Sequence, residues 1–165
     1  MGEQRNGSAD LAAMEAILTE EDLGHLGLTL GGEVYVVPIN YTYTEGRILM
    51  HCALEGRKLD MIRANPSACF TVARQEGRPS PHAGDLCDNA FESVLCWGQA
   101  RVIDDPAERR TILEEFQARY ATSQGPRAPV TEQQVQRCGA IEIRVSRMTG
   151  RRGGKQKASW NWEAP

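Results

Sequence analysis

The chain has 165 residues and a net charge of −3, with 41% hydrophobic and 25% charged residues. This composition is typical of a globular protein, and the length favours one domain with its own core. The charge gives no reason to expect a nucleic-acid partner, and no apolar run approaches the ~20 residues that would span a bilayer. Residues 1–10 are polar and lack the apolar core of a secretion signal, so we expect a cytoplasmic protein.

Strand patterns joined by short turns, with helical patterns between them, run through the chain. The predicted strands cover residues 26–30, 34–43, 48–52, 67–74, 91–103 and 138–148. The predicted helices cover residues 11–19, 56–64, 106–120 and 131–137. Connections this short favour antiparallel pairing. The pattern therefore predicts a mainly β protein, a six-stranded antiparallel split β-barrel with three or four short peripheral helices. It forms one domain over residues 1–150, followed by a basic and aromatic tail over 151–165.

A candidate anion site lies where the third strand leads into the second helix. His51 ends the strand, and Gly56, Arg57 and Lys58 stand where the helix opens. A helix start offers free N–H groups and a partial positive charge, which two neighbouring cations reinforce. Taken one at a time, Arg57 and Lys58 could be ordinary surface cations, and His51 could be a histidine whose hydrogen bonds are made within the protein. Their succession predicts a site for the phosphate of a cofactor.

The strand Val36-Val37-Pro38-Ile39-Asn40-Tyr41 carries a proline in its interior. Proline cannot donate to a strand ladder, so it marks an edge, a bulge or backbone that faces a ligand. An edge with nothing bound is an equally good explanation of this proline alone. The Asn40 amide both donates and accepts hydrogen bonds, which suits the edge of a heteroaromatic ring.

These residues, with Met50 to Pro66 and Ala68 to Val72, resemble the FMN-binding split barrels related to pyridoxamine 5′-phosphate oxidase. The closest branch in pattern is the 5-nitroimidazole-resistance and flavin-nucleotide-binding proteins. Phe91 to Val94, Gly98 to Ala100 and Ile141 to Gly150 add weaker matches. The resemblance covers about residues 11–152 and is most specific over 36–65.

The resemblance implies a homodimer with FMN in the cleft between subunits. It places residues of three segments on the cofactor, the second and third strands and the helix start, and residues of a later strand on the same cleft. The implied FMN-binding residues are Val37, Pro38, Ile39, Asn40, His51, Ala53, Arg57, Lys58, Ser93, Trp97 and Gly98. The later strand, from Ser93 to Gly98, is expected to come from the same or the partner subunit.

The function that the resemblance implies is FMN-dependent reduction of a small acceptor, of nitroaromatic or quinone type, with electrons from NAD(P)H. The flavin performs the redox chemistry, and the protein positions it. His51 is the candidate catalytic residue because its charge changes near neutral pH. True pyridoxamine phosphate oxidases carry an Arg-rich motif near the C-terminus. That motif is not found here in the same form, so this activity is not favoured.

Two alternative functions and two alternative cofactors stay open. The chain could bind flavin without turnover, for storage, sensing or detoxification, or it could be an interaction protein with an empty cleft. Haem is a second cofactor candidate, with His51 or His82 as axial ligand. Zinc is the weakest, because His82-x-x-x-x-Cys87 is not a standard ligand spacing and Cys52 points away from His51 on a strand. We therefore predict no metal site.

Two further features carry expectations. Gly98, inside the longest predicted strand, predicts a bulge or a close approach to its backbone. Trp160 and Trp162 stand in the tail, where exposed indoles are costly. We expect both to dock on the body of the protein or on a partner subunit.

Overall fold

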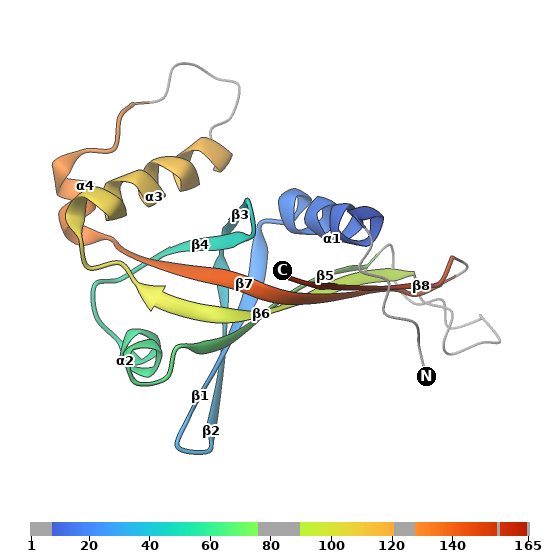
Figure 1. Ribbon diagram of the computed structural model, residues 1–165. Helices are drawn as coiled ribbons and strands as arrows, with labels where there is room; N and C mark the ends of the chain where they lie inside the picture. Colours follow the sequence, from blue (N-terminus) through green and yellow to red (C-terminus); the bar gives the residue numbers. More distant parts are fainter. Residues whose placement is uncertain (1–7, 76–89, 121–127, 155, 165) are drawn as a thin grey trace.

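The computed structural model describes residues 8–75, 90–120, 128–154 and 156–164 as a strongly curled antiparallel sheet with helices around it (Figure 1). The helices are α1 (Ser8–Glu20), α2 (Arg57–Ala64), α3 (Pro106–Tyr120) and α4 (Glu132–Arg137). The strands are β1 (Leu23–Leu30), β2 (Glu33–Asn40), β3 (Thr42–Thr44), β4 (Arg47–Cys52), β5 (Ser67–Gln75), β6 (Phe91–Val102), β7 (Gly139–Arg152) and β8 (Ala158–Glu163). No helix in the described ranges is long and apolar enough to cross a membrane.

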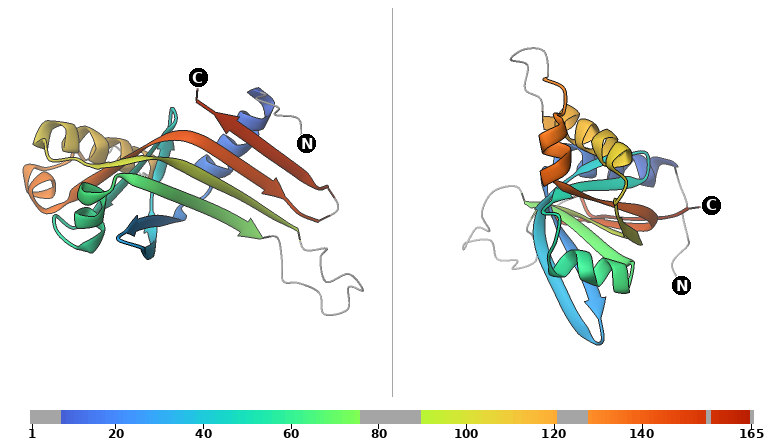
Figure 2. Two further views of the ribbon diagram at one scale, coloured as in Figure 1. Left: turned by 60° about the horizontal axis from the view of Figure 1, so that its bottom comes forward. Right: turned by 90° about the vertical axis from the view of Figure 1, so that its left-hand side faces the viewer.

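The strand order is β2-β1-β5-β6-β7-β4-β3, with β8 on the free side of β7. The sheet curls far enough that β2 and β4, which are far apart in this order, come into contact without forming a ladder. The views in Figure 2 show the resulting half-barrel. The prediction of a mainly β split barrel is thereby confirmed.

The described residues form eight strands, two more than the six predicted. The predicted strand over 34–43 is divided at Tyr41, whose ring is fully buried and whose hydroxyl donates to the carbonyl of Leu18, 2.8 Å away. Burying this side chain leaves Tyr41 unpaired between β2, which pairs with β1, and β3, which pairs with β4. The second additional strand is β8.

The strand β8 lies where we predicted a tail. It pairs with residues 147–152 of β7, so residues 158–163 belong to the sheet. Trp160 is 8% exposed and stands over Gly150, while Trp162 packs at the margin of the core. The structure confirms that both tryptophans dock on the body of the protein, within their own chain.

The bulge predicted at Gly98 is present and organises the barrel. Between Trp97 and Gly98 the register with β7 shifts, leaving Ser146 as the extra residue of β7. Its hydroxyl donates to the Trp97 carbonyl at 3.1 Å. The first half of β7, residues 139–144, pairs with β4, and the second half, 147–152, pairs with β8. The bulge thus marks the point at which β7 changes its second partner, because a bulge bends and twists its strand.

Helix α1 closes the concave side of the sheet. Its Met14, Ile17 and Leu18 are at most 2% exposed and join the main core with residues from every long strand. Burying three side chains of this size stabilises the fold by several kcal/mol, at about 1.5–3 kcal/mol each. Helix α1 thereby fixes the curl that brings β2 toward β4.

Helices α3 and α4 cover the other side of β4 and β7. Leu49 and Ala140 from the strands pack with Ile103 and Ile112 in a second small core. Thr131, the first residue of the helix predicted over 131–137, caps α4 in a capping box with Gln134. This arrangement sets α3 beside the end of β4, where the predicted site residues begin.

Candidate functional site

The start of α2 presents the features predicted for an anion site. Gly56 is the N-cap with φ +132°, a conformation that strains any residue with a Cβ, although nothing lies within 4 Å of the place a Cβ would occupy. Its carbonyl accepts from the N–H groups of Leu59 and Asp60 at 2.9 and 3.3 Å. Helix geometry leaves the N–H groups of Arg57 and Lys58 without a partner inside the helix. Two donors therefore remain available at the positive end of α2.

The two cations at this helix start differ in what they touch. Arg57 forms an ion pair with Glu33, at the tip of the β1–β2 hairpin, and both side chains are more than half exposed. Lys58 is half-buried and forms no ion pair within the described ranges. Its charge acts on the thiol of Cys52, where burial raises the pKa and Lys58 opposes that rise. Of the two cations, Lys58 is therefore the one close to the end of β4, and no carboxylate among the described residues forms an ion pair with it.

Strand β2 offers its outer edge beside that helix start. Gly31 and Gly32, both at positive φ, form a two-residue turn between the paired residues Leu30 and Glu33. In an antiparallel ladder the pairs alternate, so the backbone of Val36 and Pro38 points away from β1. Pro38 lacks an N–H where the ladder needs none. The proline is accommodated at an open edge, as predicted, and that edge presents carbonyl groups.

The side chains of the β2 segment point in two directions. Val37 and Ile39 are half-buried and pack against the core, whereas Pro38 and Asn40 are exposed. The Asn40 amide donates to the Asp22 carbonyl at 3.0 Å. The backbone groups of Val37 and Ile39 face β1 as well, so this edge can meet a ligand through the carbonyl groups of Val36 and Pro38. Asn40 keeps its amide oxygen available.

The end of β4 carries His51, and we refer to the region between this strand end, the edge of β2 and the start of α2 as the opening. The His51 ring is exposed on one side and meets the Phe116 ring edge-on, with centroids 4.4 Å apart and planes at 67°. Burial lowers the pKa of His51 below its usual value of 6.5. The imidazole is therefore neutral at neutral pH, with one nitrogen that donates and one that accepts. Ala53, two residues on, is exposed at the same end of the strand.

We expect His51 to titrate with a midpoint below 6.5, followed by NMR of its ring protons. Phe116→Ala removes the apolar cover and should move the midpoint back toward 6.5, while Thr111→Ala, exposed on α3, should leave it unchanged. Because the folded pKa is depressed, the unfolded chain binds more protons between the two pKa values. The contribution of His51 to stability therefore decreases as the pH falls below 6.5. A midpoint unaffected by Phe116→Ala would contradict this account.

The predicted residues on β6 form a separate group. Three strand spacings of ~4.8 Å separate β6 from β2 within the sheet. Ser93 and Trp97 are half-buried, and the Arg147 guanidinium lies 3.8 Å from the centre of the Trp97 ring. Gly98 is buried, and the place of its missing Cβ is 2.0 Å from the Arg144 carbonyl oxygen. The close approach predicted at Gly98 is thus made by the backbone of β7.

An apolar groove of about 410 Å³ runs over the sheet between these two groups. It joins residues of β1, β2, β5 and β6. Val34 and Val36 are 75% and 60% exposed beside it, and Trp97 forms part of its wall. The predictions from sequence missed Val34, Val36 and Glu33. The two valines stand at alternate positions of a strand, and this alternation was the available signal.

The metal and haem alternatives fall partly outside the described ranges. His82 and Cys87 lie there, as does most of the predicted loop over 75–89. Among the residues that the structure describes, no group of three or more His, Cys, Asp or Glu is placed to hold a metal ion. His51 is the one predicted axial ligand whose surroundings can be stated.

The sequence matches the model of the family described as "Pyridoxamine 5'-phosphate oxidase" over residues 10–152. This chain belongs to that family, and the split-barrel fold agrees with the match. The comparison with curated proteins found no match.

Several solved structures are similar. A candidate 5-nitroimidazole antibiotic resistance protein from Bacteroides thetaiotaomicron is 26% identical, with a TM-score of 0.69 over 84% of this chain and 81% of that chain. A flavocytochrome from Azotobacter vinelandii is 18% identical, with a TM-score of 0.73 over 98% and 79% of the two chains. An FAD and heme binding protein from Mycobacterium smegmatis is 13% identical, with a TM-score of 0.75 over 97% and 75%. The last two likenesses concern the fold alone.

Proposed function

We propose that this protein binds FMN in the opening between β2, the end of β4 and the start of α2. The observation that carries the proposal is the start of α2. Two N–H groups without a partner in the helix lie there, with the Lys58 ammonium, which no carboxylate of the described residues pairs. Such a helix start favours a phosphate. The matched family and the FAD-binding neighbour support a flavin as the bearer of that phosphate.

The residues present fit this cofactor. Lys58 and the helix N–H groups would hold the phosphate, and Arg57 would join them on exchanging Glu33 for the stronger anion. The edge of β2 at Pro38 and the oxygen of Asn40 would meet the polar rim of the ring system. His51 and Ala53 border the same opening. Bound FMN would supply hydride acceptance and electron transfer.

We further propose an oxidoreductase that takes electrons from NAD(P)H and reduces a small acceptor of nitroaromatic or quinone type. The similar candidate 5-nitroimidazole resistance protein supports a nitroaromatic acceptor. His51 is the proposed catalytic residue: as a neutral imidazole it would donate a hydrogen bond toward the ring without placing a positive charge beside it.

The proposed assembly is a homodimer formed through the apolar groove. A second copy would cover Val34 and Val36, which leave a large apolar area on the β1–β2 hairpin exposed in one chain. It would also bring its own β6, with Ser93 and Trp97, toward the flavin opening that borders the same strand. Sedimentation equilibrium measures this directly, and a monomer at micromolar concentration would overturn the assembly.

The second candidate is a protein that binds its cofactor without catalysing a reaction. The flavocytochrome and the FAD and heme binding protein support haem as the alternative cofactor of such a protein. Visible absorption separates the candidates. Flavin bands in the purified protein, or after adding FMN, support the proposal, and a Soret band points to haem. Loss of the flavin bands on adding NADH without oxygen distinguishes an enzyme from a passive binder. A colourless protein that takes up no FMN would overturn the flavin proposal.

Lys58→Ala should weaken FMN binding by about 2 kcal/mol, roughly 30-fold, because a charge-assisted contact to the phosphate is lost. Fluorescence titration of the apoprotein with FMN measures the effect. Arg63→Ala is the matched control, since Arg63 lies in the same helix but pairs with Asp104 at 2.8 Å at its other end. Equal affinities for Lys58→Ala and the wild type would remove Lys58 from the site.

A further inference from the structure

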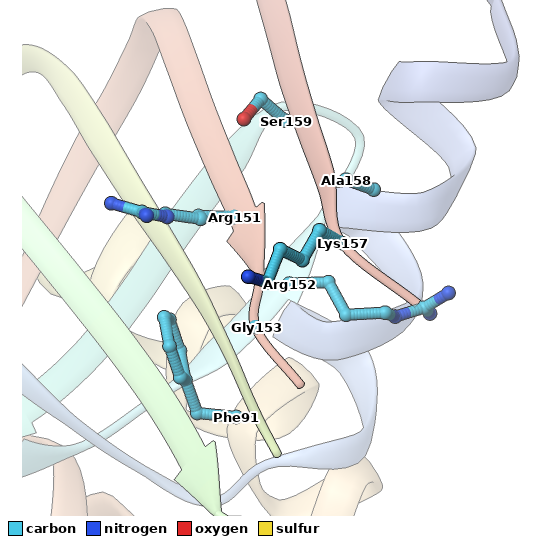
Figure 3. A pocket seen from close by; sticks show the side chains of 7 residues that line it. All are labelled: Phe91, Arg151, Arg152, Gly153, Lys157, Ala158 and Ser159. Carbon is cyan, nitrogen blue, oxygen red and sulfur yellow. The ribbon is translucent and has the colours of Figure 1, made fainter. Parts of the chain in front are cut away.

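A cavity of about 380 Å³ lies at the turn between β7 and β8 (Figure 3). Arg151 and Lys157 line it, and Arg151 pairs with Ser93 on β6. In the proposed homodimer, β6 of the second copy would bring this cavity with it to the flavin opening. The cavity is therefore part of the proposed flavin cleft and not a separate site. The last turn of α3, in contrast, reaches both strand ends of the opening within one chain.

The opening begins where β2 and β4 part. Thr42 pairs with Leu49 in the ladder between β3 and β4. Continuing this register by two residues places Asn40 opposite His51, although Asn40 itself pairs with Leu23 of β1. The strands β2 and β4 contact each other without forming a ladder. Asn40 and His51 thus stand opposite each other at the edge of the opening.

Helix α3 reaches both strand ends through two aromatic side chains one turn apart. Phe116 meets the His51 ring, and the Tyr120 ring packs on Phe116 with centroids 4.7 Å apart. The Tyr120 hydroxyl lies 2.7 Å from the Tyr41 carbonyl oxygen and 3.1 Å from that of Asp22. Its single hydrogen goes to the nearer oxygen, that of Tyr41. The hydroxyl oxygen keeps its lone pairs for another donor.

The amide of Asn40 is held by these same groups. Its nitrogen donates to the Asp22 carbonyl at 3.0 Å. A carbonyl can only accept, so this contact determines which end of the amide is the nitrogen. The amide also donates to the Tyr120 hydroxyl, and this bond acts against the rise that burial causes in the pKa of Tyr120. Both amide hydrogens are thereby used within the protein, and the amide oxygen is the group left for a ligand.

We propose that Tyr120 is a positioning residue, and that the Asn40 oxygen it fixes selects a ring edge that carries an N–H donor. The imide edge of a flavin presents such an N–H between two carbonyl groups. The edge of a haem carries propionate, methyl and vinyl groups, none of which donates a hydrogen bond to an amide oxygen. The arrangement therefore favours a flavin over a haem, and it rests on the proposed binding of FMN.

Fluorescence titration of the apoprotein with FMN and with 3-methyl-FMN, in which a methyl group replaces the imide hydrogen, tests the selection. We expect the wild type to bind FMN ~10-fold more tightly than 3-methyl-FMN, because the methylated ring cannot donate to Asn40. Tyr120→Phe keeps the ring against Phe116 but releases the amide, so this ratio of affinities should fall at least ~3-fold. Asn40→Ala removes the oxygen and should lower the ratio at least as far.

Two control variants separate positioning from a general loss of structure or of binding. Tyr43→Phe also removes a tyrosine hydroxyl, one that donates to Glu15 of α1 at 2.7 Å, and should leave the ratio unchanged. Lys58→Ala should weaken both flavins alike, again with an unchanged ratio. A ratio that is equal in the wild type and Tyr120→Phe, or that falls equally in Tyr43→Phe, would overturn the proposal.

A second measurement needs no cofactor. In the apoprotein, Tyr120→Phe should speed the exchange of the Asn40 side-chain amide hydrogens with water ~5-fold, because one acceptor is lost, and Tyr43→Phe should not change it. NMR of isotope-labelled protein measures this exchange. Unchanged exchange in Tyr120→Phe would overturn the positioning role. A chain that binds neither flavin would instead overturn the flavin proposal, and the exchange rates would then decide the role of Tyr120 by themselves.

Discussion

Replacing Glu142 by alanine should lower the free energy of unfolding by about 2–3 kcal/mol, as expected when a buried carboxylate loses its hydrogen bonds from charged partners. The Glu142 side chain is 3% exposed, between the sheet and α3. It accepts from Arg144 at 2.8 Å and from Arg101 at 3.0 Å, and Arg47 lies 3.8 Å away. Without the carboxylate, three arginines whose side chains are 29%, 40% and 73% exposed lose their shared counter-charge. Urea denaturation followed by circular dichroism measures the loss.

Glu108→Ala is the matched control for Glu142→Ala. Glu108 also pairs with Arg101, but its side chain is 41% exposed, so its removal should cost at most about 1 kcal/mol. Similar decreases in the free energy of unfolding in the two variants would show that the burial of Glu142 adds nothing to its contribution to stability.

The same cluster predicts a dependence on pH. Burial raises the pKa of Glu142, but the hydrogen bonds from Arg101 and Arg144 outweigh it, and the pKa stays below the usual 4.5. A depressed carboxyl pKa stabilises the folded state above 4.5, and this stabilisation is lost as the pH falls below that value. Glu142→Ala should therefore weaken the loss of stability on acidification.

Gly98→Ala should destabilise the fold by about 3 kcal/mol, at the upper end of what overpacking costs. An added Cβ would stand 2.0 Å from the Arg144 carbonyl oxygen and 2.8 Å from its carbon. Both are backbone atoms, so no side chain can turn aside. The strand β7 must move at the bulge where it passes from β4 to β8. Thermal unfolding followed by circular dichroism measures the change.

Gly27→Ala is the companion measurement for Gly98→Ala. Gly27 also lies in a strand, and the nearest atom to its added Cβ is the Cys69 carbonyl oxygen at 3.1 Å. A shift of a few tenths of an ångström accommodates that contact, so the cost should be clearly smaller. A loss in Gly98→Ala no greater than in Gly27→Ala would refute the account of the bulge.

Much of the fold follows from local patterns in the sequence. The strand and helix patterns predicted elements that the structure confirms within a few residues. Strand β8 was missed because the basic, glycine-rich stretch before it is typical of a chain end. The alternation of Trp160 and Trp162 was the signal for a strand. The break at Tyr41 could not be predicted, because a contact with α1, distant in sequence, produces it.

In the candidate site, too, features set by neighbours in sequence could be predicted, whereas contacts between distant segments could not. The Gly56-Arg57-Lys58 helix start and the Pro38 edge depend on neighbours in sequence, and the structure has both. The Arg57–Glu33 pair and the Phe116 ring against His51 join segments 24 and 65 residues apart. No repeating pattern of residues in the sequence indicates contacts between segments so far apart. The placement of Ser93 and Trp97 opposite the flavin opening is a question of assembly and stays a prediction.

The proline of β2 has a consequence for how this protein avoids unwanted association. A bare strand edge is a template on which another chain can add a strand, and the hairpin carries exposed Val34 and Val36 that would favour it. Pro38 removes one donor from that edge, so a continuous ladder cannot extend past it. A ligand that needs only one or two carbonyl groups is not affected. The edge therefore admits a small molecule while it resists strand-by-strand aggregation.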